Sequence, residues 1–262
     1  MIIDEYKKPQ TIEEAYSILT TKKNSQIIGG GAYLRLSKKH ISSAIDLSNL
    51  KLDFISETDD YIEIGAMTTL RELEINEITK KYFNGIISNS IRNIVGVQLR
   101  NIATTGGAIS GKFGFSDLIT ALSVLDCKVI LYKAGAVKLV DFINQKYNDI
   151  VEKIIIRKNN QIADFQAIRN TKTDYAILNV AVSKHTNNSY KIAVGARPGI
   201  AIFAVKAEGF LKTVDSSKEN AEKAGLIASQ EIKFTSNFRA SAEYRQELCK
   251  VLVSRAICNI NK

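Results

Sequence analysis

Apolar and polar residues along the first fifty positions predict one helix between short strands. Thr11 and Glu14 form a capping box, whose hydroxyl and carboxylate bond the free amides of a helix start, and the apolar spacing that follows predicts a short helix. Gln26–Ile28 is typical of a buried strand and runs into three glycines, and residues 44–47 predict the next strand. Together these elements indicate one compact unit.

The next hundred residues predict a hairpin, a helical stretch and a further strand. Residues 54–58 and 61–65 flank Asp59 and Asp60, which is typical of a β-hairpin. Thr69 and Glu72 form a second capping box, and the helical spacing continues from there toward Ile94. A strand is predicted at residues 128–132.

From residue 150 onward the pattern changes to short β-rich runs and then to helices. The runs at residues 150–158, 161–169, 175–183 and 190–196 predict an antiparallel sheet. After Pro198, apolar residues recur every three or four positions at residues 203–212, 216–232 and 241–257, which predicts helices. We therefore expect an N-terminal domain over residues 1–155, with subdomains at about 1–52 and 53–155, and a C-terminal domain over residues 156–262.

The net charge of the chain excludes few kinds of binding partner. The chain has 36 basic and 27 acidic residues, a net charge of +9, which suits nucleic acid, an acidic partner or a phosphate-bearing ligand. The basic residues are scattered in pairs such as Lys22-Lys23, without a dense basic stripe or a nucleic-acid-binding motif. We therefore expect no nucleic acid partner.

Cysteine spacing and hydropathy exclude other classes. Cys127, Cys249 and Cys258 form no CxxC pair, so we expect neither a disulfide framework nor a metal site within this chain. No run approaches the roughly 18 apolar residues of a membrane-spanning helix, and the N-terminus lacks the apolar core of a signal peptide. These features predict a cytoplasmic protein without a membrane span.

Two glycine loops are candidate anion sites. Gly29, Gly30 and Gly31 directly follow a predicted strand, where glycine lets the backbone turn sharply and present successive amides to a phosphate. The second loop is Thr104-Thr105-Gly106-Gly107-Ala108, whose threonines add hydroxyl donors. Neither loop fits the Walker or GxGxxG pattern, and a glycine run after a strand is by itself more often just a tight turn. The two together can hold one diphosphate.

Few residues suggest side-chain catalysis. Asp117 follows the second loop and either caps a helix or accepts a hydrogen bond from a ligand hydroxyl, and both roles are compatible. The two histidines, His40 and His185, have polar neighbours that predict surface positions. We therefore predict no catalytic side chain, which fits a protein whose cofactor carries the chemistry.

Several segments resemble a known family over essentially the whole chain. They are IIGGGAYL, IEIGAMTTLREL, GVQLRNIATTGGAIS, SDLITALSVLDCKVIL, TDYAILNVAVS and VGARP, and the block from residue 98 to residue 131 is the most specific. In order and spacing they resemble the FAD-binding medium subunits of molybdenum hydroxylases, of the xanthine dehydrogenase and carbon monoxide dehydrogenase type.

The resemblance implies an α+β fold and a flavin site. It implies a two-subdomain FAD-binding fold of the vanillyl-alcohol-oxidase (PCMH) type, followed by a C-terminal α+β domain with an antiparallel sheet and helices. It assigns the FAD diphosphate to the two loops and a flavin contact to the aspartate after the second loop. The residues concerned are Gly29, Gly30, Gly31, Ala32, Tyr33, Leu34, Thr104, Thr105, Gly106, Gly107, Ala108 and Asp117.

The chain departs from the family pattern at four positions. Ala32 stands where relatives usually have threonine, and Tyr33 stands where a small polar or acidic residue usually follows. Ala108 replaces an asparagine, and Ala167 falls where a lysine is frequent. Each of the three alanines removes a side-chain hydrogen-bonding group, a loss of about 0.5 to 1.5 kcal/mol for a neutral bond. An alternative hypothesis is therefore a degenerate scaffold or assembly subunit that binds flavin weakly or not at all. A stand-alone flavin reductase fits less well, because VGARP and the helical C-terminus resemble the hydroxylase subunits.

The resemblance also implies partners. A small subunit with two [2Fe–2S] clusters and a large molybdopterin subunit would complete a heterotrimer, and two heterotrimers would form a dimer. FAD would pass electrons between the clusters and NAD or another acceptor, while substrate is oxidised on the large subunit.

Overall fold

The chain folds into two compact units that are interleaved along the sequence. The computed structural model describes all 262 residues. Unit 1 comprises Met1–Leu73, Val97–Gly111 and Cys127–Arg157, and unit 2 comprises Glu74–Gly96, Lys112–Asp126 and Lys158–Lys262. Two stretches from the middle of the sequence therefore belong to the same unit as the C-terminal region, and the domain limits at residues 155 and 156 stay a prediction.

Unit 1 begins with a three-stranded parallel sheet. Its strands are β1 (Ile2–Lys7), β3 (His40–Asp46) and β2 (Gln26–Ile28), in the order β1-β3-β2. Helix α1 (Ile12–Thr21) packs Ala15 against the core that contains Ile45. The Thr11 side chain accepts a hydrogen bond from the Glu14 amide, so the first capping box is confirmed. Strand β1 was not predicted because, as an edge strand, it exposes most of its side chains.

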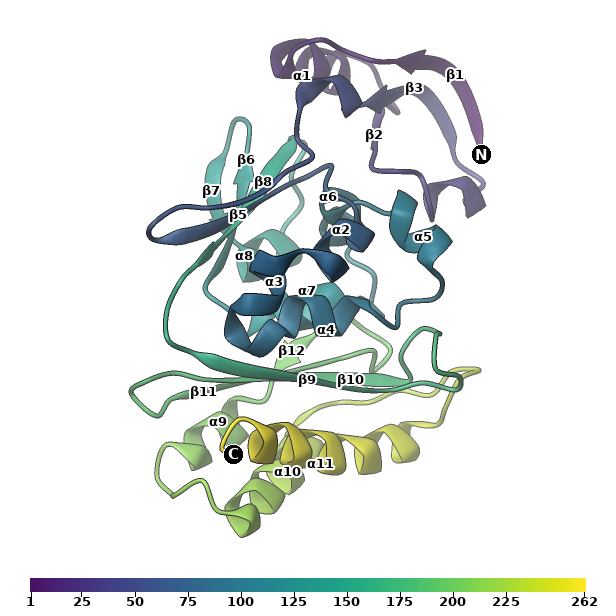
Figure 1. Cartoon of the computed structure of the whole chain (residues 1–262). Helices are drawn as coiled ribbons and strands as arrows, with labels where there is room; N and C mark the ends of the chain where they lie inside the picture. Colours follow the sequence, from purple (N-terminus) through teal and green to yellow (C-terminus); the bar gives the residue numbers. More distant parts are fainter. The chain divides into compact units, whose positions relative to one another are not determined.

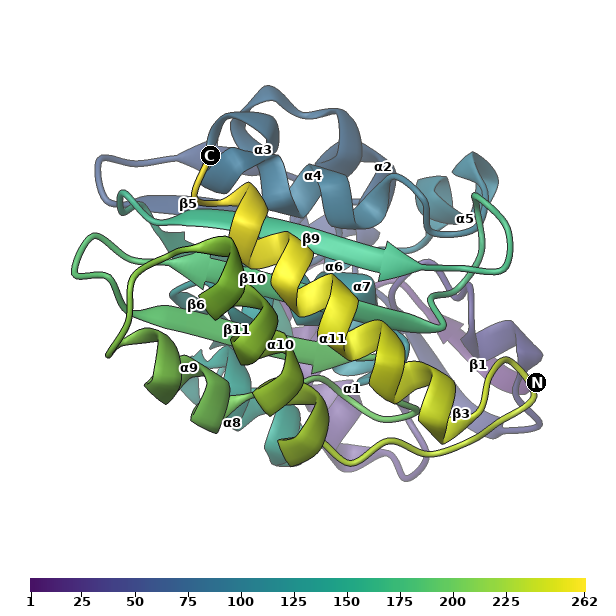
Figure 2. The ribbon, with the colours of Figure 1, turned by 90° about the horizontal axis from the view of Figure 1, so that it is seen from below.

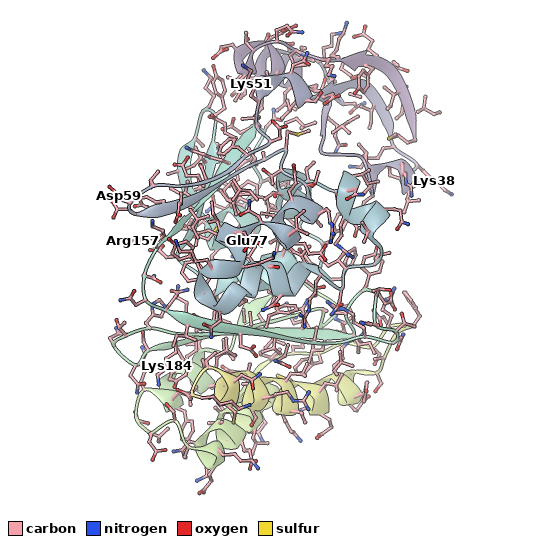
Figure 3. All side chains as sticks on the ribbon, in the orientation of Figure 1. Lys38, Lys51, Asp59, Glu77, Arg157 and Lys184 are labelled. Carbon is pink, nitrogen blue, oxygen red and sulfur yellow. The ribbon has the colours of Figure 1, made fainter.

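The second sheet of unit 1 has five antiparallel strands. They are β4 (Ile55–Glu57), β5 (Tyr61–Gly65), β8 (Val151–Arg157), β6 (Cys127–Leu131) and β7 (Gly135–Lys138), in that order. The predicted hairpin is confirmed, and Figure 3 shows Asp59 at its turn. The amide and hydroxyl of Thr69 both bond Glu72, which confirms the second capping box at α2 (Leu70–Ile75).

The remaining short elements of unit 1 connect these sheets. They are the 3₁₀ helices η1 (Leu34–Leu36) and η2 (Ser48–Leu50) and the helices α5 (Val97–Ile102), α6 (Thr105–Ser110) and α8 (Leu139–Asn144). Helix α8 packs on β6 and β7, and α6 packs on β5 and β8.

Unit 2 is a sheet with helices on both faces (Figure 1). Its antiparallel strands are β12 (Ile202–Phe203), β11 (Tyr190–Gly195), β10 (Leu178–Lys184) and β9 (Ile162–Ile168), in that order. One face carries α3 (Glu77–Lys81), η3 (Phe83–Gly85), α4 (Ile86–Ile91) and α7 (Asp117–Ser123). The other carries α9 (Val205–Leu211), α10 (Lys218–Glu231) and α11 (Ala242–Asn259).

The three C-terminal helices are confirmed and bury the larger core of unit 2. Figure 2 shows α11 crossing the strands with α10 and α9 beside it. Val180, Ile192, Ala224 and Val253 are fully buried in this core. None of the helices in the structure is both long enough and apolar enough to cross a membrane.

Two predictions about elements were wrong. The helical stretch toward Ile94 is broken, because the Asn76 side chain caps a new helix at Ile78 and both Asn84 and Gly85 have positive φ. The run at residues 150–158 does not join the sheet of unit 2, because β8 pairs with β5 and β6 in unit 1. Alternation of apolar residues identifies a strand but not its neighbours.

Candidate functional site

The first glycine loop is a sharp turn that only glycine can make. It connects the end of β2 at Ile28 to η1, where Tyr33 is the N-terminal flanking residue and Leu34 the first helical one. Gly30 and Gly31 have φ values of +72° and +69°, in the left-handed region. A Cβ atom on Gly30 would lie 1.5 Å from the carbonyl oxygen of Ile102, so no side chain fits there.

This loop presents three successive amides without an acceptor. The N–H groups of Gly30, Gly31 and Ala32 lie outside helices and strands and donate no hydrogen bond within the protein. Gly30 is exposed and Gly31 half-buried, while Ala32 is 5% exposed, so the turn opens to the surface at Gly30. Consecutive backbone amides in a turn with left-handed residues form a concave site for an anion. The residues therefore fit a phosphate group held by backbone donors.

The second loop differs because the protein itself uses its amides. The amide of Thr105 donates to Thr68 O at 2.8 Å, and that of Gly106 donates to Ala66 O at 2.8 Å. The Gly107 amide donates to the Thr104 hydroxyl at 3.2 Å, which caps α6, and the Ala108 amide donates to Thr104 O at 2.8 Å. The amides of the second loop are therefore already paired within the protein.

The two threonine hydroxyls of the second loop differ in whether they can donate to a ligand. The Thr105 hydroxyl is fully buried and donates to Thr68 O at 3.0 Å. The Thr104 hydroxyl accepts from Gly107, and its own O–H has no acceptor in the protein. Thr104 is thus the one threonine of this loop with a donor left for a ligand.

The two loops touch each other within unit 1. A Cβ atom on Gly29 would lie 2.5 Å from the Thr104 Oγ1 atom, and one on Gly107 would lie 3.0 Å from the Gly29 carbonyl oxygen. A Cβ atom on Gly106 would lie 2.9 Å from the Cβ of Ala66. The glycines therefore allow close backbone contact, by which the second loop supports the first.

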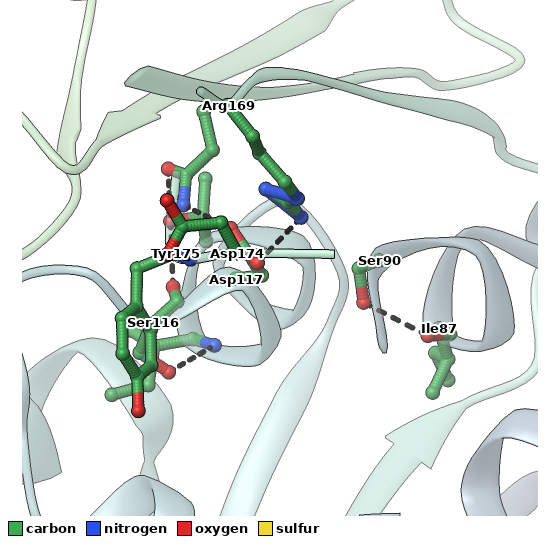
Figure 4. Close-up of polar contacts among 10 residues, drawn as sticks. Ile87, Ser90, Ser116, Asp117, Arg169, Asp174 and Tyr175 are labelled. Atoms are coloured by element: carbon green, nitrogen blue, oxygen red, sulfur yellow. Dashed lines mark hydrogen bonds and ion pairs between the residues drawn. The ribbon is translucent and has the colours of Figure 1, made fainter. Parts of the chain in front are cut away.

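Asp117 lies in unit 2, at the start of α7, and is almost completely buried. Ser116 is the capping residue, since its side chain accepts from the Ile119 amide, so the expectation that Asp117 caps the helix was wrong. The Oδ2 atom of Asp117 pairs with Arg169 Nη2 at 2.7 Å, as Figure 4 shows, and its Oδ1 accepts from Asn179 Nδ2 at 2.6 Å. Both carboxylate oxygens are therefore engaged.

The buried cluster around Asp117 is polar but incompletely paired. Burial raises the pKa of Asp117 to about 6, although Arg169 and the Asn179 hydrogen bond act in the opposite direction. Thr120 donates to Asn179 Oδ1 at 2.9 Å, which fixes the orientation of the amide. Arg169 is 6% exposed at its side chain, and its Nη1 atom is buried without a partner.

Sequence reasoning did not identify Arg169 or Asn179. Asn179 is a fully buried amide in the largely apolar strand β10, and a polar residue in such a run was a usable signal. Ala167, which stands opposite Asn179 in the β9–β10 register, provides no polar side chain there. No feature of the sequence near Arg169 predicts its ion pair, because its contact with Asp117 spans 52 positions of the sequence.

The histidines take no part in either group. His40 is largely exposed and pairs with Asp4. His185 is half-buried, with its Nε2 atom buried and unpartnered, so the expectation of a surface position was wrong for this residue. Burial lowers the pKa of His185, with Lys191 acting in the same direction.

Two family profiles together match most of the chain. Residues 3–158 match the FAD binding domain in molybdopterin dehydrogenase, and residues 163–260 match the CO dehydrogenase flavoprotein C-terminal domain.

Similar proteins include two medium subunits. The nicotine 6-hydroxylase medium subunit of Paenarthrobacter nicotinovorans is 26% identical over 96% of this chain and 95% of its own length. The glyceraldehyde dehydrogenase medium chain of Sulfolobus acidocaldarius is also 26% identical, over 96% of both proteins.

Solved structures share the fold. A chain of carbon monoxide dehydrogenase from Hydrogenophaga pseudoflava gives a TM-score of 0.89 at 21% identity, covering 98% of this chain and 96% of that one. A chain of quinoline 2-oxidoreductase from Pseudomonas putida 86 gives 0.87 at 22% identity, with the same coverage.

Proposed function

Because the chain belongs to the FAD-binding subunits of the molybdopterin-dependent dehydrogenases, we propose that it passes electrons between the [2Fe–2S] clusters of a partner subunit and NAD or another acceptor. Its cofactor is FAD. The observation that carries the proposal is the set of three unpartnered amides at Gly30, Gly31 and Ala32, directly after β2. No histidine or other catalytic side chain is required, because the flavin supplies the redox chemistry when bound.

We assign the diphosphate to the first loop, over Gly29–Leu34, with different roles for its members. Gly30, Gly31 and Ala32 donate from their backbone, while Gly29 allows the second loop to approach. Tyr33 and Leu34 form the start of η1, whose amides continue the turn. Since the donors belong to the backbone, alanine in place of threonine at position 32 removes a side-chain contact without removing the amide.

The second loop, over Thr104–Ala108, is assigned mainly a supporting role. The Thr104 hydroxyl is its available donor to a ligand. The Thr105 and Gly106 amides bond Thr68 and Ala66 and so hold α6 in place. The Gly107 and Ala108 amides bond Thr104 at the start of the helix. Asparagine in place of Ala108 would add one side-chain donor, so its loss weakens binding by an amount on the order of one neutral hydrogen bond.

The proposal implies a multisubunit enzyme. The similar proteins from Paenarthrobacter and Sulfolobus are named as medium subunits or chains of an enzyme. We extend this to a small [2Fe–2S] subunit and a large molybdopterin subunit in a heterotrimer in the cytoplasm, with dimerisation of the heterotrimer. The oxidised substrate is a property of the large subunit.

The alternative is a scaffold subunit without bound flavin. It is favoured by Ala32, Ala108 and Ala167, which remove three polar side chains relative to the family pattern. It is opposed by the unpartnered amides of the first loop, which form the kind of turn that binds a phosphate group through its backbone.

Coexpression with the two partner subunits tests the function. We expect acid treatment of the purified complex to release FAD that is detected by its fluorescence, and we expect the bound flavin to be reduced when NADH is added without oxygen, because electrons then reach FAD. A complex that assembles but releases no flavin would support the scaffold alternative. If the complex retains flavin but the flavin reacts only with another electron donor or acceptor, NAD would be excluded. The electron-transfer role would then stand.

A further inference from the structure

Two buried side-chain atoms near the C-terminal end of α7 have no hydrogen-bonding partner in the protein. They are Oε1 of Gln161, a residue that is 4% exposed, and Nε2 of the half-buried His185. Both residues belong to unit 2. A buried polar atom without a partner is costly, and such atoms in native proteins usually bond an internal water or a ligand.

The β9–β10 ladder brings the two side chains together. Its last pair is Ile162 with Lys184, so Gln161 and His185 are the next residues along the two strands. Residues opposite each other in antiparallel strands project to the same face, with Cβ atoms about 5 Å apart. One small molecule between the two side chains can therefore reach both unpartnered atoms.

The orientation of the Gln161 amide is fixed by Val124, which directly follows α7. Gln161 Nε2 donates to Val124 O at 3.4 Å, and the Ser183 hydroxyl donates to the same oxygen at 2.7 Å. A carbonyl oxygen can only accept, so turning the amide over would place two oxygens against each other. Rotation of the amide therefore does not provide Oε1 with a partner.

We propose that one internal water molecule binds between Gln161 and His185, accepting from an Nε2–H group of the imidazole and donating to Oε1 of the amide. A water molecule donates and accepts at once, so it satisfies both buried atoms, and a buried water typically makes about three hydrogen bonds. The bound water then joins β9 to β10 beside the end of α7. This site is separate from the proposed flavin-binding loops.

The charges around His185 favour a neutral molecule over an ion. Burial lowers the pKa of His185, Lys191 acts in the same direction, and Asp126 acts against them. The ring is therefore mainly neutral at pH 7, and the Lys191 ammonium disfavours a second cation beside it. An anion is disfavoured by Oε1 of Gln161, because both would be acceptors. Water fits both constraints.

A double-mutant cycle in the full chain tests whether the two residues share a partner. Urea unfolding should show that His185→Phe and Gln161→Met each raise the equilibrium constant of unfolding about tenfold, because each leaves the other group without its bridge. The double variant should raise it by about the same factor and not about a hundredfold. Factors that multiply in this cycle would overturn the proposal.

The matched control cycle combines His185→Phe with Gln246→Met. Gln246 also donates its amide to a backbone carbonyl, Ser229 O at 3.1 Å, but has no unpartnered buried atom. The factors of these two substitutions should therefore multiply. Equal coupling in both cycles would mean that it reflects a general loosening of the fold, which would also overturn the proposal.

Nuclear magnetic resonance distinguishes a water bridge from a direct bond between the side chains. The chain has two histidines, so His40→Phe leaves His185 as the only imidazole to observe. We expect long-range proton–nitrogen spectra to place the ring proton on Nε2, and we expect this proton to show a cross-peak with bound water. A proton on Nδ1 alone, or an Nε2 proton without contact to water, would overturn the proposal.

Discussion

Asp117 combines complete burial with two strong hydrogen-bonding partners, and burial has the larger effect on its protonation. The carboxylate loses its hydration, which raises its pKa from 3.8 to about 6 despite the adjacent Arg169 guanidinium. Near pH 7 the ionised form still predominates, so the ion pair with Arg169 is present. Below pH 6 the carboxyl group becomes protonated and the pair loses its charge balance.

This burial has a measurable consequence for stability. The folded state binds the Asp117 proton more tightly than the unfolded state, so this group stabilises the fold fully below pH 3.8 and that contribution is lost as the pH rises through 6. We expect the free energy of unfolding of wild type, minus that of Asp117→Asn, to fall between pH 4.5 and pH 7.5, by at most about 1.4 kcal/mol per pH unit. Urea unfolding of both proteins across this range measures it. A difference that rises with pH would mean that pairing with Arg169 outweighs burial.

At the scale of elements, one buried arginine organises the segment between α10 and α11. Arg245 on α11 is 1% exposed and donates to the carbonyl oxygens of Ile177, Thr235 and Ala240. It also donates to Asn237 Oδ1 at 2.6 Å. The segment before α11 is therefore tied to the helix and to the start of β10 by one side chain.

Replacing this arginine should be strongly destabilising. Arg245→Met leaves three carbonyl oxygens without their donor, and we expect a loss of about 3 kcal/mol or more in the free energy of unfolding. Arg255→Met is the control, since Arg255 is an exposed residue of the same helix and should change stability by less than about 0.5 kcal/mol. Urea denaturation of both variants gives the comparison. Equal effects would show that the Arg245 contacts add no net stability.

The elements best predicted from sequence are those with local signals. Both capping boxes form at Thr11 and Thr69, because their partners lie three residues away. The break after Asn76 and the pairing of β8 were not predictable in this way. The first depends on a single side-chain cap and on positive φ at Asn84. The second depends on pairing with β5, about ninety positions earlier in the sequence.

For the molecule as a whole, local and distant contacts also distinguish the glycine loops of unit 1 from the polar cluster of unit 2. The first glycine loop was identified from three consecutive glycines after a strand, and its φ values explain why glycine is needed. The second loop was also found, but the use of its amides by Thr68 and Ala66 depends on a distant segment. Arg169 and Asn179 required the fold, because they reach Asp117 from β9 and β10 across more than fifty positions.

The interleaving of the two units also has a tertiary origin. Residues 74–96 and 112–126 pack with the sheet of unit 2, whereas residues 97–111 between them carry the second glycine loop in unit 1. No composition change or flexible linker marks these crossings in the sequence. The sequence pattern therefore predicts individual helices and strands more readily than the unit to which each belongs.

The central claim is that the backbone amides of the first loop hold the diphosphate of FAD. The direct measurement is the Kd of the purified chain for FAD and for riboflavin, which lacks the diphosphate, in wild type, Gly31→Ala and Gly209→Ala. Gly31 has φ +69° with its nearest atom at 3.5 Å, so alanine distorts the turn without a severe clash, while Gly209 has open space around it. We predict that wild type and Gly209→Ala bind FAD far more tightly than riboflavin, and that Gly31→Ala loses most of this preference. Equal affinities for the two flavins in wild type, or a preference unchanged in Gly31→Ala, would contradict the account.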